Sequence, residues 1–285
     1  MGRSDRMRIL AMILAAVMLV CALTACGTVT EPVQVFDGAN TIPIIPESGV
    51  PVSELTEDDF IADQNGIPVY KGELYTTERG VDVSEFQGDI DWAAVAGGNV
   101  QFVFLRCGYR GASEGGLSAD QRFRENFDEA RAAGLEVGVY FYSQALNKTE
   151  ALEEAELVQE TLDGRVPDLP VIFDWERNDT VEGSRTLSAD GEAVTDAAVA
   201  FCQAVKLAGY TPGIYMNLNT GYHIWDLSKL SDYVIWLSDP SAYPHFYYQF
   251  EYWQYSFTGS VPGIAGECDL NMRFMPREVS SAPPQ

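Results

Sequence analysis

The stretch Leu169-Pro170-Val171-Ile172-Phe173-Asp174-Trp175-Glu176 is an apolar run that closes on two acids separated by one tryptophan. Short apolar runs of this kind are typical of buried strands. Residues i and i+2 of a strand lie on the same face, so the carboxylates of Asp174 and Glu176 are expected to project together from the strand end. Glycosidic-bond cleavage requires such a pair, with one protonated and one ionised carboxyl. Acids also end many surface strands, so this motif alone does not establish a catalytic site.

The sequence around this stretch alternates between strand-like and helix-like segments. Strands are expected at residues 80–86, 101–109, 136–143, 169–176, 211–217 and 232–238. Helices, with apolar residues every three or four positions, are expected at residues 122–133, 149–162 and 191–208. Two further strand-like runs, residues 250–256 and 267–272, have no helix between them. The expected fold class is therefore α/β, a modified TIM-like (β/α) barrel with fewer helices than strands.

Barrels of this class carry their chemistry at the carboxyl ends of the strands. Four acids are expected at or near those ends: Asp82, Asp174, Glu176 and Asp269. Four aromatic residues in the same region are candidate sugar-stacking side chains: Tyr140, Tyr142, Tyr215 and Trp253. Converging acids repel one another and are tolerated mainly at functional sites, so this end of the barrel is the candidate active site.

The N-terminus has the features of a secretory signal. Arg3, Arg6 and Arg8 precede an apolar run over residues 9–23, which ends in Leu23-Thr24-Ala25-Cys26. The run is shorter than the ~20 residues that a membrane span needs. The Leu-x-Ala-Cys ending resembles the lipobox of bacterial lipoproteins. Residues 1–25 are therefore expected to be a lipoprotein signal peptide, with Cys26 lipidated and the protein anchored to the outer surface of the bacterial cell membrane.

The remaining chain divides by composition into three parts. Residues 26–79 are rich in Pro, Asp, Glu and small polar residues, without a sustained period, and are expected to form an acidic tether. Residues 80–276 carry the strand and helix patterns and form the expected catalytic barrel. Residues 277–285 are expected to be a flexible tail.

Composition excludes several classes of function. The chain has 18 basic and 42 acidic residues, a net charge of -24, which argues against nucleic acid as a partner. It has only two histidines, His223 and His245, far apart in sequence, so neither a metal centre nor a Ser or Cys nucleophile with a His partner is expected. No cofactor is expected, and we expect a monomer. Cys107, Cys202 and Cys268 have no metal-ligand spacing, and no disulfide framework is expected.

Several motifs together resemble family 25 glycoside hydrolases, the Chalaropsis-type lysozymes. The matching stretches are Gly80-Val81-Asp82-Val83-Ser84-Glu85-Phe86-Gln87-Gly88, Asp89-Ile90-Asp91-Trp92, Ala132-Ala133-Gly134-Leu135-Glu136-Val137-Gly138-Val139-Tyr140, Asp174-Trp175-Glu176, Trp253-Gln254-Tyr255 and Asp269-Leu270-Asn271. They cover about residues 80–274 in the family's order. The polar stretch over residues 177–190 lengthens the loop after the acid pair and leaves subsite preference open.

The resemblance implies a peptidoglycan hydrolase that cleaves the β-1,4 bond after N-acetylmuramic acid in glycan strands. By the same resemblance, Glu176 matches the family's proton donor and Asp174 the partner acid, while Asp82 and Asp269 match two further acids of the cleft. Two alternatives remain at this point. One is a non-catalytic glycan-binding lipoprotein on the same fold, and the other is a chitinase-like hydrolase that uses the same acids.

Overall fold

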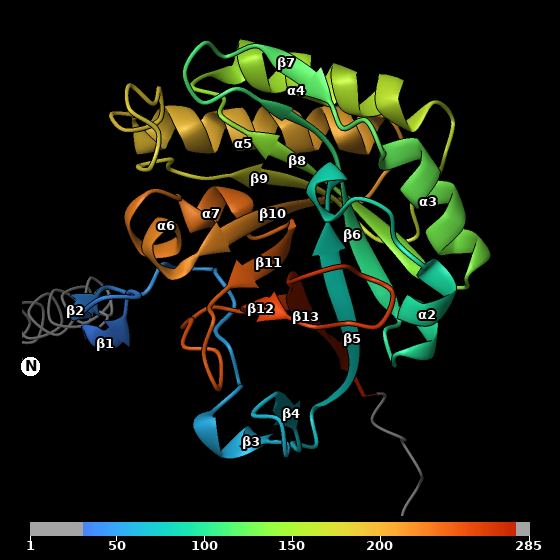
Figure 1. The fold of residues 1–285 in the computed structure, drawn as a ribbon. Coiled ribbons are helices and arrows are strands. Elements are labelled where there is room, and N and C mark those ends of the chain that lie inside the picture. Colours follow the sequence, from blue (N-terminus) through green and yellow to red (C-terminus); the bar gives the residue numbers. More distant parts are fainter. Residues whose placement is uncertain (1–30, 278–285) are drawn as a thin grey trace, which may run out of the picture. The chain divides into compact units, whose positions relative to one another are not determined.

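A closed barrel is the central feature of the computed structural model, which describes residues 31–277 (Figure 1). Its strands are β5 (Tyr75–Val83), β6 (Phe102–Arg110), β8 (Glu136–Ser143), β9 (Val171–Trp175), β10 (Pro212–Asn217), β11 (Val234–Ser238), β12 (Tyr252–Gly259) and β13 (Cys268–Pro276). The first seven pair in parallel, while β13 runs antiparallel to both β12 and β5 and closes the barrel. A short strand, β7 (Leu117–Ala119), pairs with β6 outside this ring.

Helices cover only part of the barrel. They are α2 (Trp92–Gly97), α3 (Phe123–Ala132), α4 (Lys148–Leu162), α5 (Gly191–Leu207), α6 (Leu218–His223) and α7 (Leu227–Leu230), with 3-10 turns η1 (Glu57–Asp59) and η2 (Glu85–Gln87). Over residues 31–277 the six α-helices are fewer than the eight barrel strands, and none lies between β11, β12 and β13. The expected modified barrel with fewer helices than strands is confirmed.

Strand β9, which leads to the acid pair, has the alternation that its sequence predicts. Phe173 faces outward and packs against Phe201 of α5, with ring centroids 5.0 Å apart. Trp175 also faces outward, packs against Trp225 at 5.8 Å and donates its indole N–H to the carbonyl of Ala145. Between them, the side chains at even positions turn into the barrel, as the two-residue period of a strand requires.

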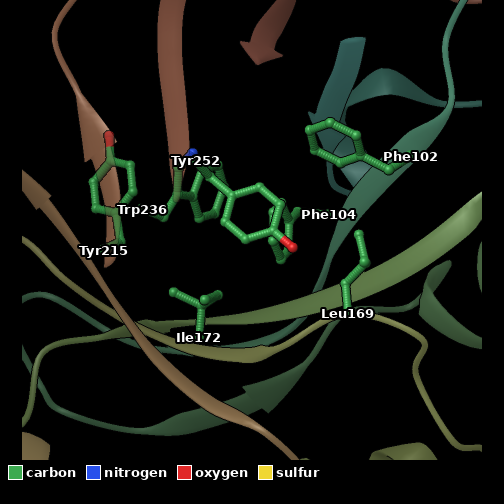
Figure 2. Close-up of a cluster of buried hydrophobic side chains, with 7 residues drawn as sticks. All are labelled: Phe102, Phe104, Leu169, Ile172, Tyr215, Trp236 and Tyr252. Carbon is green, nitrogen blue, oxygen red and sulfur yellow. The ribbon is translucent and has the colours of Figure 1, made fainter. Parts of the chain in front are cut away.

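Aromatic side chains fill the barrel interior. The cluster in Figure 2 consists of Phe102, Phe104, Leu169, Ile172, Tyr215, Trp236 and Tyr252. Phe104 stacks on Trp236 with ring centroids 4.6 Å apart. Space for these rings depends on glycines, since a Cβ at Gly80 or Gly138 would lie 2.2 or 2.3 Å from a phenylalanine ring carbon. The barrel interior is therefore a packed core rather than a pore. A site at the carboxyl ends of the strands would lie directly on this core.

Part of the region expected to be a tether is folded. It contains β1 (Val33–Phe36), β2 (Thr41–Ile44), β3 (Phe60–Ala62) and β4 (Pro68–Tyr70), and β5 begins at Tyr75 rather than residue 80. Phe60 is buried against Trp253 and Phe274, at centroid distances of 5.4 and 6.2 Å. The composition of residues 26–79 did not predict this folded part. A few aromatic residues pack the segment against the barrel, and they hardly change the average polarity of the stretch.

The expected signal peptide (residues 1–25), the lipidation site Cys26 and most of the expected tail (residues 278–285) lie outside the described residues. Within residues 31–277, no helix combines the length and apolarity needed to cross a membrane.

Candidate active site

A cavity of about 130 Å³ opens at the carboxyl ends of the barrel strands. Its walls are Asp82, Arg106, Tyr140, Tyr142, Asp174, Glu176, Tyr215, Trp236, Gln254 and Asp269. The structure thus brings together the four acids singled out from the sequence, which come from β5, the end of β9 and β13. It also places the cavity directly above the aromatic core, because Tyr215 and Trp236 belong to both.

A second cavity, of about 320 Å³, lies near the opposite ends of the strands. Its lining includes Tyr75, Ile235, Phe246 and Phe274, and Glu251 is the only acid among the described residues that line it. It offers space but no acid pair. Acid–base chemistry therefore belongs to the smaller cavity.

Asp82 and Asp269 form a pair across the β5–β13 ladder, where they are directly opposite each other. The side-chain Nε2 of Gln254 donates to Asp82 Oδ1 at 2.9 Å and to Asp269 Oδ2 at 3.1 Å. Asn271 Nδ2 donates to the same Asp82 oxygen at 2.7 Å. Burial raises the pKa of Asp82 to about 6, and burial together with the charge of Asp82 raises the pKa of Asp269 to about 8. The pair therefore retains a proton near neutral pH.

Two hydrogen bonds orient the amides that contact this pair. Tyr215 donates its hydroxyl to Gln254 Oε1 at 2.8 Å, and Trp236 donates its indole N–H to Asn271 Oδ1 at 2.8 Å. Each amide oxygen is thus occupied by a donor, so each NH₂ group must point toward the carboxylates. Gln254 and Asn271 are positioning residues of the acid cluster.

Asp174 and Glu176 project from one strand end into the cavity, as their spacing predicts. Burial, followed by the charge of Asp82, raises the pKa of Glu176 to about 7. Burial first, then the charges of Glu176 and Asp82, also raises the pKa of Asp174 well above its usual range. Asp174 is only 5% exposed, and its Oδ1 has no hydrogen-bond partner among the described residues. The raised pKa values favour a proton on both acids.

This differs from the simple expectation that Asp174 stays ionised beside a protonated Glu176. Asp174 lies deeper than Glu176, and none of residues 31–277 donates a hydrogen bond to its free oxygen, so its charged form is disfavoured. An N–H donor from a bound substrate would supply the missing partner. Substrate binding would then be needed for Asp174 to ionise while Glu176 keeps its proton.

Arg106 is the one cation that lines the cavity in the described part of the chain. Its Nε donates to Asp120 Oδ2 at 3.0 Å, and its NH2 group lies 3.3 Å from Glu85 Oε1. Its positive charge lowers the pKa of Asp174 and opposes the effect of burial. The sequence offered a signal for it, because Arg106 follows the inward-facing Phe104 by two residues at the end of β6.

The four candidate sugar-stacking aromatics have different environments. Tyr140 and Tyr142 line the cavity and are partly exposed, while Tyr215 lines it but is buried and bonded to Gln254. Trp253 is fully buried, does not line the cavity, and donates to the carbonyl of Asp239 at 2.8 Å. A side chain without exposed surface cannot stack on a sugar, so Trp253 is a core residue in this structure. Its neighbour Gln254 takes the inward position.

The long loop over residues 177–190 is hydrogen-bonded to Tyr142 of β8 and to Gln144 just after β8. Gln144 donates to the backbone carbonyl of Glu176 at 2.9 Å, and Thr186 donates to Gln144 at 3.3 Å. Asn178 donates its backbone N–H to Thr186 and its side-chain NH₂ to the Tyr142 hydroxyl, at 3.0 and 3.3 Å. These bonds fix the backbone at Glu176 and border the cavity beside Tyr142.

The histidines do not contribute to the cavity. His223 pairs with Asp37 at 3.0 Å, and His245 pairs with Asp239 at 2.9 Å. Over residues 31–277, no group of three or more His, Cys, Asp or Glu side chains has the arrangement of a metal site.

A closed α/β barrel with several acids in one cavity at the carboxyl ends of its strands defines a glycoside hydrolase of the barrel class. The sequence profile of Glycosyl hydrolases family 25 matches residues 81–264, and the chain belongs to this family. The match includes Asp82, Asp174 and Glu176, whereas Asp269 follows it.

Two characterised relatives agree with this assignment. The chain is 28% identical over 194 residues to the autolytic lysozyme of Clostridium acetobutylicum, covering 68% of this chain and 55% of the relative. It is 27% identical over 205 residues to lysozyme M1 of Streptomyces globisporus, covering 68% of this chain and 66% of the relative. The chain thus spans just over half and about two thirds of the length of these relatives.

Solved structures share the fold. A family 25 glycosyl hydrolase from Bacillus anthracis superposes with a TM-score of 0.58 at 24% identity, covering 72% of this chain and 91% of that one. The modular autolysin LytC from Streptococcus pneumoniae, solved in complex with a synthetic peptidoglycan ligand, superposes with a TM-score of 0.63 at 22% identity. That match covers 85% of this chain and 58% of LytC.

Proposed function

We propose that this protein cleaves the β-1,4 bond between N-acetylmuramic acid and N-acetylglucosamine in peptidoglycan, with Glu176 as general acid and Asp174 as its partner. The observation that carries the proposal is the projection of both carboxyls from one strand end into the acid-lined cavity. Membership in family 25 and the lysozyme relatives support peptidoglycan as the substrate class.

The raised pKa of Glu176, about 7, fits a proton donor. In the proposed mechanism, Glu176 protonates the glycosidic oxygen as the bond to the leaving sugar breaks. The unpartnered Oδ1 of Asp174 accepts a hydrogen bond from the substrate's acetamido N–H. That bond favours the ionised form of Asp174, which then stabilises the positive charge developing on the sugar ring. Water adds to the anomeric carbon of that ring and gives one proton to Glu176, which restores the acid and leaves a new reducing end.

The Asp82–Asp269 pair supports this chemistry from the opposite wall. With one proton shared between the two carboxyls, the pair carries about a single negative charge instead of two. Its remaining charge raises the pKa of Glu176, for which Asp82 is the second cause after burial. The pair is thus proposed to keep Glu176 protonated near neutral pH.

The site of action is proposed to be outside the cytoplasm, on the bacterial membrane surface. The Leu23-Thr24-Ala25-Cys26 ending supports a lipid anchor at Cys26. The tether proposed to follow it is shorter than residues 26–79, because Asp37 already pairs with His223 and Phe60 packs against Trp253. The net charge of -24 disfavours nucleic acid and gives no attraction toward an anionic cell wall, so the anchor would supply the localisation. A monomer contains all the acids of the cavity.

Identification of the new reducing-end sugar after digestion of purified peptidoglycan tests the proposal directly. N-acetylmuramic acid at that end is the expected result. N-acetylglucosamine or an anhydro sugar there would refute the proposed bond.

This digestion, run beside a digestion of soluble chitin oligosaccharides, separates the alternatives. A glycan-binding protein without activity would bind the walls and release no new ends, and a chitinase-like enzyme would cleave soluble chitin oligosaccharides. The presence of all four acids in one cavity favours catalysis over binding alone.

A further inference from the structure

Phe86 is an exposed aromatic residue just after strand β5. It lies in η2, four residues after Asp82, and 80% of its surface is exposed. The turn that carries it is well fixed: Ser84 Oγ accepts from the Phe86 N–H at 3.3 Å, and the Ser84 N–H donates to Gln87 Oε1 at 2.8 Å. The fold thus holds a large apolar ring in solvent on a rigid turn, without using it for packing.

One face of this ring is supported by Arg106. The guanidinium carbon of Arg106 lies 4.8 Å from the Phe86 ring centroid and 5.1 Å from that of Tyr109. Arg106 itself is 9% exposed and is held by Asp120 and Glu85. Arg106 also lines the acid cavity, so a single side chain separates the Phe86 ring from that cavity. The cation–π contact orients the ring and leaves most of it open.

The acid cavity is too small for more than a short part of a glycan strand. Its volume of about 130 Å³ is below the ~300–1,000 Å³ of pockets that enclose drug-sized ligands. Sugar units farther from the cleaved bond must therefore lie on the rim. Pyranose rings have apolar C–H faces, and a rigid aromatic ring gives large contact area with only two side-chain torsions to immobilise.

We propose that Phe86, supported by Arg106, is a stacking platform for a sugar unit of the glycan strand outside the acid cavity, on the β5–β6 side of the site. The inference rests on the proposed function and adds a substrate contact to it. Neither the acid cavity nor the candidate aromatics derived from the sequence include Phe86.

Binding measurements can test the platform separately from catalysis. In the Glu176→Gln background, calorimetry would compare Phe86→Ala, Phe86→Trp and the parent with a GlcNAc–MurNAc disaccharide and with the tetrasaccharide of two such units. Leu207→Ala is the matched control, since Leu207 is 89% exposed at the end of α5 and contacts no part of the site. We expect Phe86→Ala to weaken tetrasaccharide binding about tenfold and disaccharide binding less than about twofold. Phe86→Trp and Leu207→Ala should bind like the parent.

Three outcomes would overturn the platform: unchanged tetrasaccharide affinity in Phe86→Ala, equal losses for both sugars, or a parent that does not bind the tetrasaccharide. Wall hydrolysis by the protein with Glu176 intact shows independently whether the proposed function stands. Because Phe86 is exposed, the thermal unfolding midpoint of Phe86→Ala should match that of the parent, which excludes misfolding as the cause of a loss.

Discussion

Replacing Glu176 with Gln tests the centre of the proposed mechanism. The amide keeps the size and shape of the side chain but has no carboxylic proton to donate. General acid catalysis is typically worth ~10²–10⁴-fold, which corresponds to ~3–5 kcal/mol of barrier at 1.36 kcal/mol per tenfold. We expect Glu176→Gln to lower the rate of wall hydrolysis by that factor, with the barrel still folded.

The pH dependence makes the prediction specific to this carboxyl. The pKa of Glu176 is raised to about 7, so its proton is present below about pH 7 and is lost as the pH rises through that value. The unmodified protein should therefore lose activity about tenfold per pH unit on the basic side of its profile. The residual activity of Glu176→Gln should lack that basic limb.

Clearing of purified cell-wall suspensions across pH 4–9 would measure both effects. Glu156→Gln is a matched control, because Glu156 lies on the exposed face of α4 and does not line the acid cavity. If Glu176→Gln clears walls within about threefold of the unmodified rate, or keeps the basic limb, the general acid is another residue.

Three further predictions follow from the site and the N-terminus. Asn271→Ala removes one donor to Asp82 and leaves the buried Trp236 N–H without its acceptor, so urea denaturation should show a loss of ~1–3 kcal/mol, and an unchanged midpoint would contradict the described network. Cys26→Ala should move the protein out of the membrane fraction while the hydrolytic rate of the barrel stays the same; unchanged partition would instead support an uncleaved helix. Activity should persist in excess chelator, because the proposed steps use carboxyl groups alone, and a collapse there would contradict the site.

The local sequence pattern was sufficient to predict the barrel fold and the meeting of its four acids at one end of the barrel. The two-residue period of β9 separates Asp174 from the outward-facing Trp175, and the observed helices α3, α4 and α5 lie within a residue or so of the expected ranges. The segment around Phe60 was missed because its docking depends on Trp253 and Phe274, far away in the sequence.

The details of the site depended on contacts that a single sequence does not reveal. Gln254 could have been distinguished from Trp253 by alternation, since β12 places only one of the two neighbours inside the barrel. Asn271 and Arg106 act through partners on other strands, so their roles required the strand order. The raised pKa of Asp174 could not be predicted from the sequence. The two-residue period of a strand predicts which way a side chain points, but not how deeply it is buried.

The closing strand β13 determines when the acid cluster comes into existence. Asn271 and its partner Asp82 are 189 residues apart in the chain, and Asp269 reaches its place opposite Asp82 only when β13 pairs with β5. Pairings of such long sequence separation are slow to form because a large loop must close first. A nascent chain, or a fragment cut before β13, therefore has neither Asp269 nor the amide of Asn271 beside Asp82. In the proposed wall hydrolase, this topology would delay a complete active site until β13 has been synthesised and has paired with β5.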